Sequence, residues 1–396
     1  MNQFAKAEIS GTVSPDYEPV RRAFAENFAR RGELGAAVAV VRHGELVVDL
    51  WGGLRDEEIG APWGRDTMVL VFSATKGMSA LALALAHSRG WLDYDAKVAD
   101  YWPEFAAKGK SAITLRQLLA HQAGLHAFRE KVNREVIDDP AGLADIMARA
   151  PPAWPPGSRN AYHALTLGFY QGEILRRVDP EHRSLGRFFQ EEIARPLGIE
   201  FFIGLPDDIP NSRLALLRRP GMLASLAGVP LPFALALLAP WSHSFRALMV
   251  NPGTGILLDT TRVYARELEI PSGGGVGTAR ALARAYGAFA GEGGALGLRA
   301  ETLAALRQPA QPPARGFFDA VLRCEAQYSL GFMKPFAGFP FGHDGAFGAP
   351  GAGGSMGYGD PETGIGYGYV TNRMGTGIDA DPRDIALRKA LAEVTG

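Results

Sequence analysis

The two ends of this chain carry the same pattern, and that pattern constrains the fold more than any other feature. Residues 16–32, DYEPVRRAFAENFARRG, place apolar side chains at helical spacing, and residues 36–53, AAVAVVRHGELVVDLWGG, are two apolar runs around an RHGE turn. These patterns predict a helix followed by a β-hairpin. A second hairpin is predicted over 354–372, with DPETG as its turn, and a last helix over 382–394. We therefore expect both ends to share one antiparallel sheet that is covered by helices.

The middle of the chain is more helical in pattern and is rich in proline and glycine. We therefore predict an α/β (α+β) fold with two domains. Residues 1–100 and 265–396 form a discontinuous α/β sheet domain in this prediction, and residues 101–264 form a mainly helical domain. The helical domain includes an apolar, lid-like segment at 215–245.

Part of that segment has the composition of a membrane span. Residues 222–241, MLASLAGVPLPFALALLAPW, are almost wholly apolar and are about as long as a transmembrane helix. Pro230, Pro232 and Pro240 interrupt the run, and proline breaks helical hydrogen bonding. A buried or lid-forming segment beside an apolar pocket is therefore favoured over a stable membrane span, and peripheral membrane contact stays open.

Composition and spacing exclude several classes of function. The 396 residues are 47% hydrophobic, which suffices for a sizeable core, and the net charge of −1 gives no sign of a nucleic-acid partner. Cys324 is the single cysteine, so there is no intrachain disulfide or multi-cysteine metal site. The histidines lack metal-ligand spacing, and the glycine-rich 272–279 lacks the setting of a phosphate loop, so we expect no metal and no cofactor. The N-terminus has no apolar signal core, which predicts a cytoplasmic protein.

Residues 71–86, VFSATKGMSALALALA, place a serine and a lysine where an apolar run turns into a helix. Ser73 and Lys76 are three residues apart, so they share a face of that helix. The free N–H groups at the helix start suit an anionic acyl intermediate and help to keep the lysine neutral. A neutral lysine can take the serine proton and so activate a nucleophile. The alternative is that Ser73 only caps the helix and that Lys76 is solvated.

Several ordered motifs resemble those of the serine β-lactamases and penicillin-binding proteins, whose nucleophile lies in an S-x-x-K motif. The resemblance is to the branch of class C β-lactamases, D-alanyl-D-alanine carboxypeptidases and family VIII carboxylesterases. It covers most of the chain and is weakest over about 210–265. The motifs are VFSATKG, GWLDYDAKVADYWPEF (90–105), ITLRQLLAHQAGL (113–125), WPPGSRNAYHALTLGFYQGEILRRV (154–178), IPSGGGVGTARALARAY (270–286) and GAGGSMGYGDPETGIGYGYVTNRMG (351–375).

The resemblance implies a central antiparallel sheet flanked by helices, with an all-helical domain and the active site between them. It implies that Ser73 is acylated, that Lys76 is its proton partner, and that Tyr162 is the catalytic tyrosine. A phenolate at Tyr162, held near cationic Lys76, would relay protons to the leaving group and activate water. Ala164 stands where the family often has Asn or Ser. Of the nearby histidines, His121 is expected to be structural, and His163 to point away from Tyr162.

The third family motif, a Lys-Thr-Gly on the strand that faces the nucleophile, has two possible registers here. One places Gly351 after Ala349 and Pro350, with the Ala352 N–H as oxyanion donor beside that of Ser73. The other uses His343 and Gly345, with the Ala346 N–H as donor. Neither register supplies a lysine for a substrate carboxylate.

A rival serine lies in residues 353–357, GGSMG, which fit the G-x-S-x-G elbow of α/β-hydrolases. That fold orders its triad as serine, acid, histidine along the chain. The last histidine here, His343, precedes Ser355. We therefore predict that Ser355 is not the nucleophile.

We predict a serine carboxylesterase that acts on small to medium neutral esters through an acyl-enzyme. The resemblance leaves open a β-lactamase, a D-amino-acid peptidase or amidase, and an acyltransferase of the same fold. A catalytically inactive relative that binds lactams or peptides is the alternative from another class. The predicted partner is a small-molecule ester, and no oligomeric state is predicted.

Overall fold

The computed structural model describes residues 8–221, 228–250, 255, 257, 263–291, 293–377 and 381–396. The strands are β1 (Ile9–Val13), β2 (Gly35–Arg42), β3 (Glu45–Asp56), β4 (Ala61–Pro62), β5 (Val69–Leu70), β6 (Phe201–Ile203), β7 (Gly275–Gly277), β8 (Tyr328–Ser329), β9 (Phe332–Met333), β10 (Phe347–Pro350), β11 (Met356–Asp360) and β12 (Ile365–Thr371). The α-helices are α1 (Glu18–Arg30), α2 (Ala74–Ser88), α3 (Val98–Tyr101), α4 (Leu115–Leu119), α5 (Arg134–Ile137), α6 (Pro140–Arg149), α7 (Thr166–Val178), α8 (Leu185–Phe189), α9 (Arg195–Leu197), α11 (Leu231–Leu238), α12 (His243–Phe245), α13 (Ala279–Ala290), α14 (Ala300–Arg307) and α15 (Pro382–Thr395). Short 3₁₀ or π segments are η1 (Pro15–Tyr17), η2 (Pro103–Gly109), η3 (Gln190–Ala194), η4 (Asn211–Arg213), η5 (Arg246–Val250) and η7 (Gly294–Leu296).

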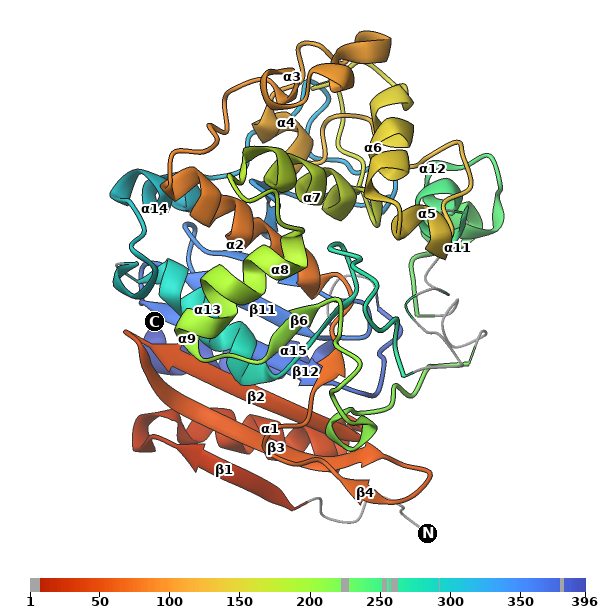
Figure 1. The fold of residues 1–396 in the computed structure, drawn as a ribbon. Coiled ribbons are helices and arrows are strands. Elements are labelled where there is room, and N and C mark those ends of the chain that lie inside the picture. Colours follow the sequence, from red (N-terminus) through yellow and green to blue (C-terminus); the bar gives the residue numbers. More distant parts are fainter. Residues whose placement is uncertain are drawn as a thin grey trace.

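One antiparallel sheet holds both ends of the chain. Its order is β1-β3-β2-β12-β11-β10-β9-β8, with β4 paired to β3. The two predicted hairpins are β2–β3 and β11–β12, and they join in the middle, where β2 pairs with β12 and Val38 lies opposite Tyr369. The prediction that both ends share one antiparallel sheet covered by helices is therefore confirmed (Figure 1).

Both faces of the sheet are covered, and β12 shows why its sequence fits this position. Tyr367 and Tyr369 belong to the core that α1 and α15 cover on one face. Gly366 and Gly368 alternate with them and face α13, where a Cβ on Gly366 would overlap the carbonyl oxygen of Ala283. Because side chains alternate between the faces of a strand, the Gly-Tyr-Gly-Tyr run packs tyrosines on one side and admits a close helix on the other.

Helix α2 lies on the same side of the sheet as α13 and contacts β10 on one side and α7 on the other. Every residue of α2 is buried. Small residues allow this close packing: a side chain at Gly77 would overlap the Tyr286 hydroxyl, and one at Gly168 of α7 would overlap the backbone of Ser272. The start of α2 is thus fixed between the sheet and the helical layer of α3–α7 (Figure 1).

The apolar segment forms short helices instead of one long one. Residues 222–227 of the predicted 222–241 run lie outside the described residues, and the rest contains α11, which is followed by α12 and η5. Among the described residues no single helix has both the length and the apolar composition of a membrane span. Leu231–Leu238 and His243–Val250 meet that test only as a pair, and the pair is bent by 69°.

The predicted domain limits at residues 100 and 265 stay a prediction. The chain between them does not remain in the helical layer, because β6 pairs with β7 in a second sheet of order β5-β7-β6. Helix α8 contacts both α2 and β6, and Figure 1 shows α8 and α9 beside α13.

Candidate active site

Ser73 stands at the first turn of α2, directly after a residue with unusual backbone geometry. Phe72 is buried and has a φ of 45°, in the left-handed region that side chains rarely adopt. Ser73 itself is already helical, with φ −64° and ψ −12°, and its side chain makes no capping hydrogen bond. A capping serine has an extended backbone and accepts an N–H bond. The structure therefore does not use the Ser73 hydroxyl as a helix cap, and the hydroxyl is turned into a cavity.

Lys76 is buried one turn further along the same face of α2. Its Nζ lies 3.3 Å from Ser73 Oγ and donates hydrogen bonds to the carbonyl oxygens of Ala164, at 2.6 Å, and Ser272, at 2.8 Å. Only 3% of the side chain is exposed. No ion pair involving Lys76 occurs in the part of the chain that the structure describes. The amine is thus held by two neutral carbonyls and aimed at the serine.

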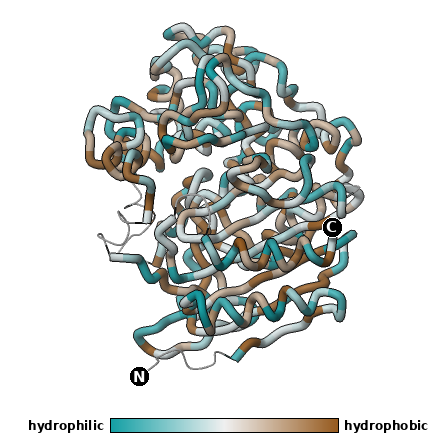
Figure 2. The backbone as a smooth tube through the Cα atoms, turned by 180° about the vertical axis from the view of Figure 1, so that it is seen from behind, coloured by the Kyte–Doolittle hydropathy of each residue, from teal (hydrophilic) through white to brown (hydrophobic). Residues whose placement is uncertain are grey.

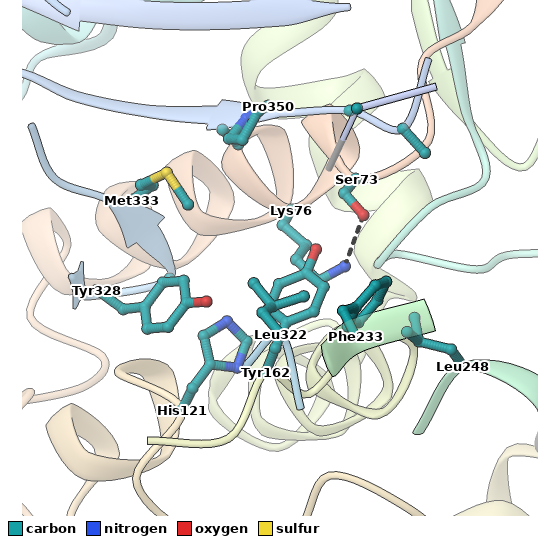
Figure 3. A pocket seen from close by; sticks show the side chains of 15 residues that line it. Ser73, Lys76, His121, Tyr162, Phe233, Leu248, Leu322, Tyr328, Met333 and Pro350 are labelled. Atoms are coloured by element: carbon teal, nitrogen blue, oxygen red, sulfur yellow. Dashed lines mark hydrogen bonds between the residues drawn. The ribbon is translucent and has the colours of Figure 1, made fainter. Parts of the chain in front are cut away.

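Tyr162 reaches the same point from the loop before α7. The residue before it donates its N–H to the carbonyl of His121 at 3.0 Å, and the N–H of His163 donates to Nδ1 of His121 at 2.9 Å. Lys76 Nζ lies 4.7 Å from the centre of the Tyr162 ring, and the Tyr162 hydroxyl shares a hydrogen bond with the Ser73 side chain. The structure therefore brings Ser73, Lys76 and Tyr162 together (Figure 3).

Burial favours the uncharged form of each of these groups. It lowers the pKa of Lys76 well below its usual value. It raises the pKa of Tyr162, against the smaller opposing effect of the hydrogen bond with Ser73. It lowers the pKa of His121 well below its usual value, and the charges of His163 and Lys76 act in the same direction. The free enzyme thus favours a neutral amine beside a protonated phenol, and not the cationic lysine and phenolate that the resemblance implied.

These groups open into a cavity of about 260 Å³ between the sheet and the helices. Its walls are mainly apolar. Among the described residues that line it, Lys76 is the only one that can carry a positive charge at a side-chain amine or guanidinium, and none is acidic. Phe233 of α11 and Leu248 of η5 form part of the wall, so the apolar segment borders the cavity. The lining residues are Ser73, Lys76, His121, Tyr162, Phe233, Leu248, Leu322, Tyr328, Gly331, Met333, Ala349, Pro350, Gly351, Ala352 and Gly377.

Strand β10 places the first of the two third-motif registers at the cavity. Gly351 and Ala352 line it, and a side chain at Gly351 would overlap the carbonyl oxygen of Val71, so only glycine fits there. The Gly351 N–H is already used, because it donates to the Ser355 carbonyl at 2.7 Å. Among the described residues, neither the Ser73 N–H nor the Ala352 N–H donates a hydrogen bond. Both N–H groups are therefore available to bind an oxyanion.

The second register and the rival serine lie away from the cavity. His343 Nδ1 is 2.7 Å from the Asp360 carboxylate, and the Ala346 N–H donates to the His343 carbonyl at 2.8 Å. Gly345 accepts a hydrogen bond from the buried amine of Lys334 through its carbonyl. None of these third-motif residues lines the cavity. Ser355 does not line it either; it is 3% exposed in the turn between β10 and β11.

Two further residues of the wall were not among the predicted catalytic or oxyanion residues. Tyr328 lines the cavity from β8, and its hydroxyl donates to the buried Asp319 carboxylate at 3.2 Å. His121, expected to be structural, also lines the cavity, with its ring centre 4.4 Å from that of Tyr328. Because Nδ1 of His121 accepts an N–H, the proton of the neutral ring lies on Nε2. His163 points away, as predicted, and its Nε2 accepts the Leu125 N–H at 3.1 Å.

Comparisons with known proteins give one consistent result. The family model described as Beta-lactamase matches residues 20–392. The esterase/beta-lactamase LipL of Mycobacterium tuberculosis is 36% identical over 373 residues, which are 93% of this chain and 84% of that protein. A crystal structure of a family VIII carboxylesterase is 35% identical, with a TM-score of 0.85, over 98% of this chain and 100% of that one. A penicillin-binding protein homologue from Caulobacter crescentus is 36% identical, with a TM-score of 0.82 and the same coverage.

Proposed function

The chain belongs to the beta-lactamase family, and we propose that it is a carboxylesterase of that family that cleaves neutral carboxylic esters through an acyl-Ser73 intermediate. A serine ester hydrolase is supported by the family VIII carboxylesterase with the same fold and by the esterases among the relatives. The observation that carries the assignment of residues is the meeting of Ser73, neutral Lys76 and Tyr162 at one end of an apolar cavity.

In the proposed first step, Lys76 acts as the general base. A neutral amine has two N–H groups and one lone pair. The N–H groups are used by the carbonyls of Ala164 and Ser272, which leaves the lone pair to face Ser73 Oγ. The lone pair takes the hydroxyl proton while Oγ bonds to the ester carbonyl carbon. The carbonyl electron pair moves to oxygen, and the N–H groups of Ser73 and Ala352 stabilise that charge.

The second half of the proposed reaction passes the proton to the leaving alcohol and the acyl group to water. When the tetrahedral intermediate collapses, its bond to the alcohol oxygen breaks, and that oxygen takes the proton from Lys76 through the Tyr162 hydroxyl. Water then attacks the acyl carbon and gives a proton to the same pair of residues. The bond from that carbon to Ser73 Oγ breaks, Oγ takes the proton back, and the carboxylic acid leaves. The sum is ester plus water giving acid plus alcohol, with Ser73 restored.

The lining of the cavity supports neutral substrates. In the described part of the wall no arginine and no lysine other than Lys76 is present to bind a substrate carboxylate. Burial lowers the pKa of Lys76 well below its usual value, which favours its uncharged form. Ala164 contributes its backbone carbonyl to Lys76, while its methyl side chain supplies no hydrogen bond to substrate. An acyl chain is accommodated by the apolar wall, whereas a free carboxylate is desolvated without a partner.

Hydrolysis of p-nitrophenyl butyrate by two serine variants tests the proposal. Ser73→Ala is expected to reduce kcat at least about a thousandfold, because the acyl-enzyme cannot form. Ser355→Ala is the matched control, since Ser355 is a buried serine in the turn between β10 and β11 that does not line the cavity. Activity that survives in Ser73→Ala and is lost in Ser355→Ala would overturn the assignment.

A further inference from the structure

The helices beside the cavity carry an unusual outer surface. Nine large hydrophobic side chains are exposed in the described part of the chain, and six of them lie within residues 231–250, here called the apolar knob. Scattered exposed hydrophobic residues are normal in proteins, but a concentration of this kind marks an interaction surface. Figure 2 shows the knob as a hydrophobic segment that stands out from the side of the molecule. The six residues are Leu231, Leu235, Leu238, Trp241, Met249 and Val250, with Trp241 the most exposed at 83%.

The knob is firmly attached, and its inner side belongs to the cavity. Phe233 and Leu248 line the cavity that contains Ser73. The Ser244 hydroxyl donates to the Val321 carbonyl, and Ser244 is 1% exposed. The same short helices thus present apolar side chains to the cavity on one side and to the surroundings on the other.

The knob carries positive but no negative charge in its own sequence. No aspartate or glutamate occurs between Ile209 and Leu258 in the sequence. Three arginines, Arg246, Arg159 and Arg323, lie close enough to His243 of α12 to lower its pKa, in addition to the larger effect of burial. Within the described residues none of the three forms an ion pair with a carboxylate. The guanidinium of Arg159 instead stacks 5.5 Å from the Trp154 ring.

Exposed leucines and a tryptophan next to unpaired arginines match the two layers of an anionic lipid surface. Leucine side chains enter the acyl region, tryptophan prefers the boundary with the headgroups, and arginine binds lipid phosphates. A second copy of the chain fits less well. In a two-fold dimer the same patch faces itself, so the arginines of one protomer would meet those of its partner.

We propose that the apolar knob docks on an anionic lipid surface and passes the acyl chains of lipid-borne neutral esters to the Ser73 cavity. The docking is a property of the knob alone, whereas the choice of substrate rests on the proposed esterase function. Because the inner side of the knob borders the cavity, an acyl chain that leaves the lipid there moves from one apolar environment to another.

Flotation with lipid vesicles tests the docking. The wild-type protein is expected to float with vesicles of phosphatidylcholine mixed with phosphatidylglycerol and to bind pure phosphatidylcholine more weakly. Trp241→Asp and Leu235→Asp change exposed side chains and are each expected to weaken binding at least about tenfold. Arg323→Ala is expected to weaken binding to the anionic vesicles about fivefold. Ile59→Asp is the matched control, because Ile59 is 71% exposed but lies far from the knob, beside β4.

Hydrolysis measured in water and in lipid vesicles separates the docking proposal from the esterase function. All of these variants are expected to hydrolyse p-nitrophenyl butyrate in water at the wild-type rate, and the two knob variants to lose most hydrolysis of a diacylglycerol held in anionic vesicles. Equal flotation of the wild-type, Trp241→Asp and Ile59→Asp proteins would overturn the docking. The docking would also be overturned if the wild-type protein were a dimer that Leu235→Asp converts to a monomer while flotation stays the same. The knob would then be a contact between copies. Failure of the wild-type protein on p-nitrophenyl butyrate would instead reject the esterase function, and flotation would still decide the docking.

Discussion

The protonation state of Lys76 determines whether it can act as a base, and the pH dependence of stability measures that state. We consider the variant Lys76→Met, which keeps a long side chain but removes the amine. In the unfolded chain a lysine has a pKa of about 10.4. In the folded enzyme burial lowers the pKa of Lys76 well below this value. Unfolding at a pH between the two values therefore takes up one proton.

The sign and size of the effect follow from this uptake. Where the unfolded state binds more protons, stability rises with pH, so the contribution of Lys76 increases toward pH 10.4 and is lost as pH falls toward the folded pKa. One proton corresponds to about 1.4 kcal/mol for each pH unit that lies between the folded and the unfolded pKa. The variant also leaves the carbonyls of Ala164 and Ser272 without their donor, which adds a constant penalty of about 1–3 kcal/mol for each.

Other buried lysines do not confuse the comparison. Burial lowers the pKa of Lys110 to about 8 and that of Lys334 to about 7. Both are present in the wild-type and variant proteins, and neither contacts Lys76, so their contributions cancel in the difference. The difference in the free energy of unfolding between wild type and Lys76→Met therefore isolates Lys76.

Urea unfolding at pH 7, 8 and 9, followed by circular dichroism, gives this difference. The free energy of unfolding of the wild-type protein minus that of Lys76→Met is expected to increase by about 1.4 kcal/mol for each unit of increasing pH. Lys389→Met, which removes an exposed lysine on α15, is the control for nonspecific effects of losing an amine. A difference that stays constant from pH 7 to pH 9 would mean that folded Lys76 is protonated, and the general-base role would be refuted.

Three further predictions concern activity. Lys76→Arg is expected to lower kcat/KM for p-nitrophenyl butyrate about 100- to 10,000-fold, because a guanidinium stays protonated; substantial activity would reduce Lys76 to an electrostatic role. Nitrocefin turnover is expected to be at least about tenfold slower than p-nitrophenyl butyrate turnover, because the described cavity wall offers no arginine and no lysine other than Lys76 to its carboxylate. Comparable rates would favour a β-lactamase. Phe233→Ala opens the cavity wall and is expected to raise the ratio of kcat/KM for p-nitrophenyl octanoate to kcat/KM for p-nitrophenyl butyrate, by up to about fourfold for each methylene newly buried. Leu235→Ala, on the outer side of α11, is the control and should leave this ratio unchanged.

The central part of the fold was predictable because its signals are local. The β2–β3 and β11–β12 hairpins have apolar runs and polar turns, and the terminal helices have a helical period. The last two strands of the sheet, β9 and the edge strand β8, are two residues long, and so short a segment has no measurable period. The return of the chain to β6 depends on tertiary pairing with β7, which composition does not encode.

The same distinction between local signals and long-range contacts holds within the candidate site. The closeness of Ser73 and Lys76 follows from their spacing on one helix. The partners that hold Lys76 are backbone carbonyls 88 and 196 residues away in sequence, and a backbone carbonyl has no residue signature. Tyr328 was not predicted because no motif distinguishes it from the other ten tyrosines.

The side of α11 that faces the cavity also required the structure. The sequence indicated an apolar segment beside a pocket, but it did not distinguish Phe233, which lines the cavity, from Leu235, which is 58% exposed. Both are apolar and lie in a run that is apolar on all sides, so the pattern has no polar face to orient it.

Covalent acylation of Ser73 is tested most directly by labelling with a fluorophosphonate and locating the adduct by peptide mass spectrometry. We predict a single adduct on the peptide that contains Ser73, present in the wild-type and Ser355→Ala proteins and absent from Ser73→Ala. An adduct on Ser355 would show that Ser73 is not the nucleophile. A folded wild-type protein that reacts with neither p-nitrophenyl butyrate nor the probe would show that Ser73 is not acylated at all.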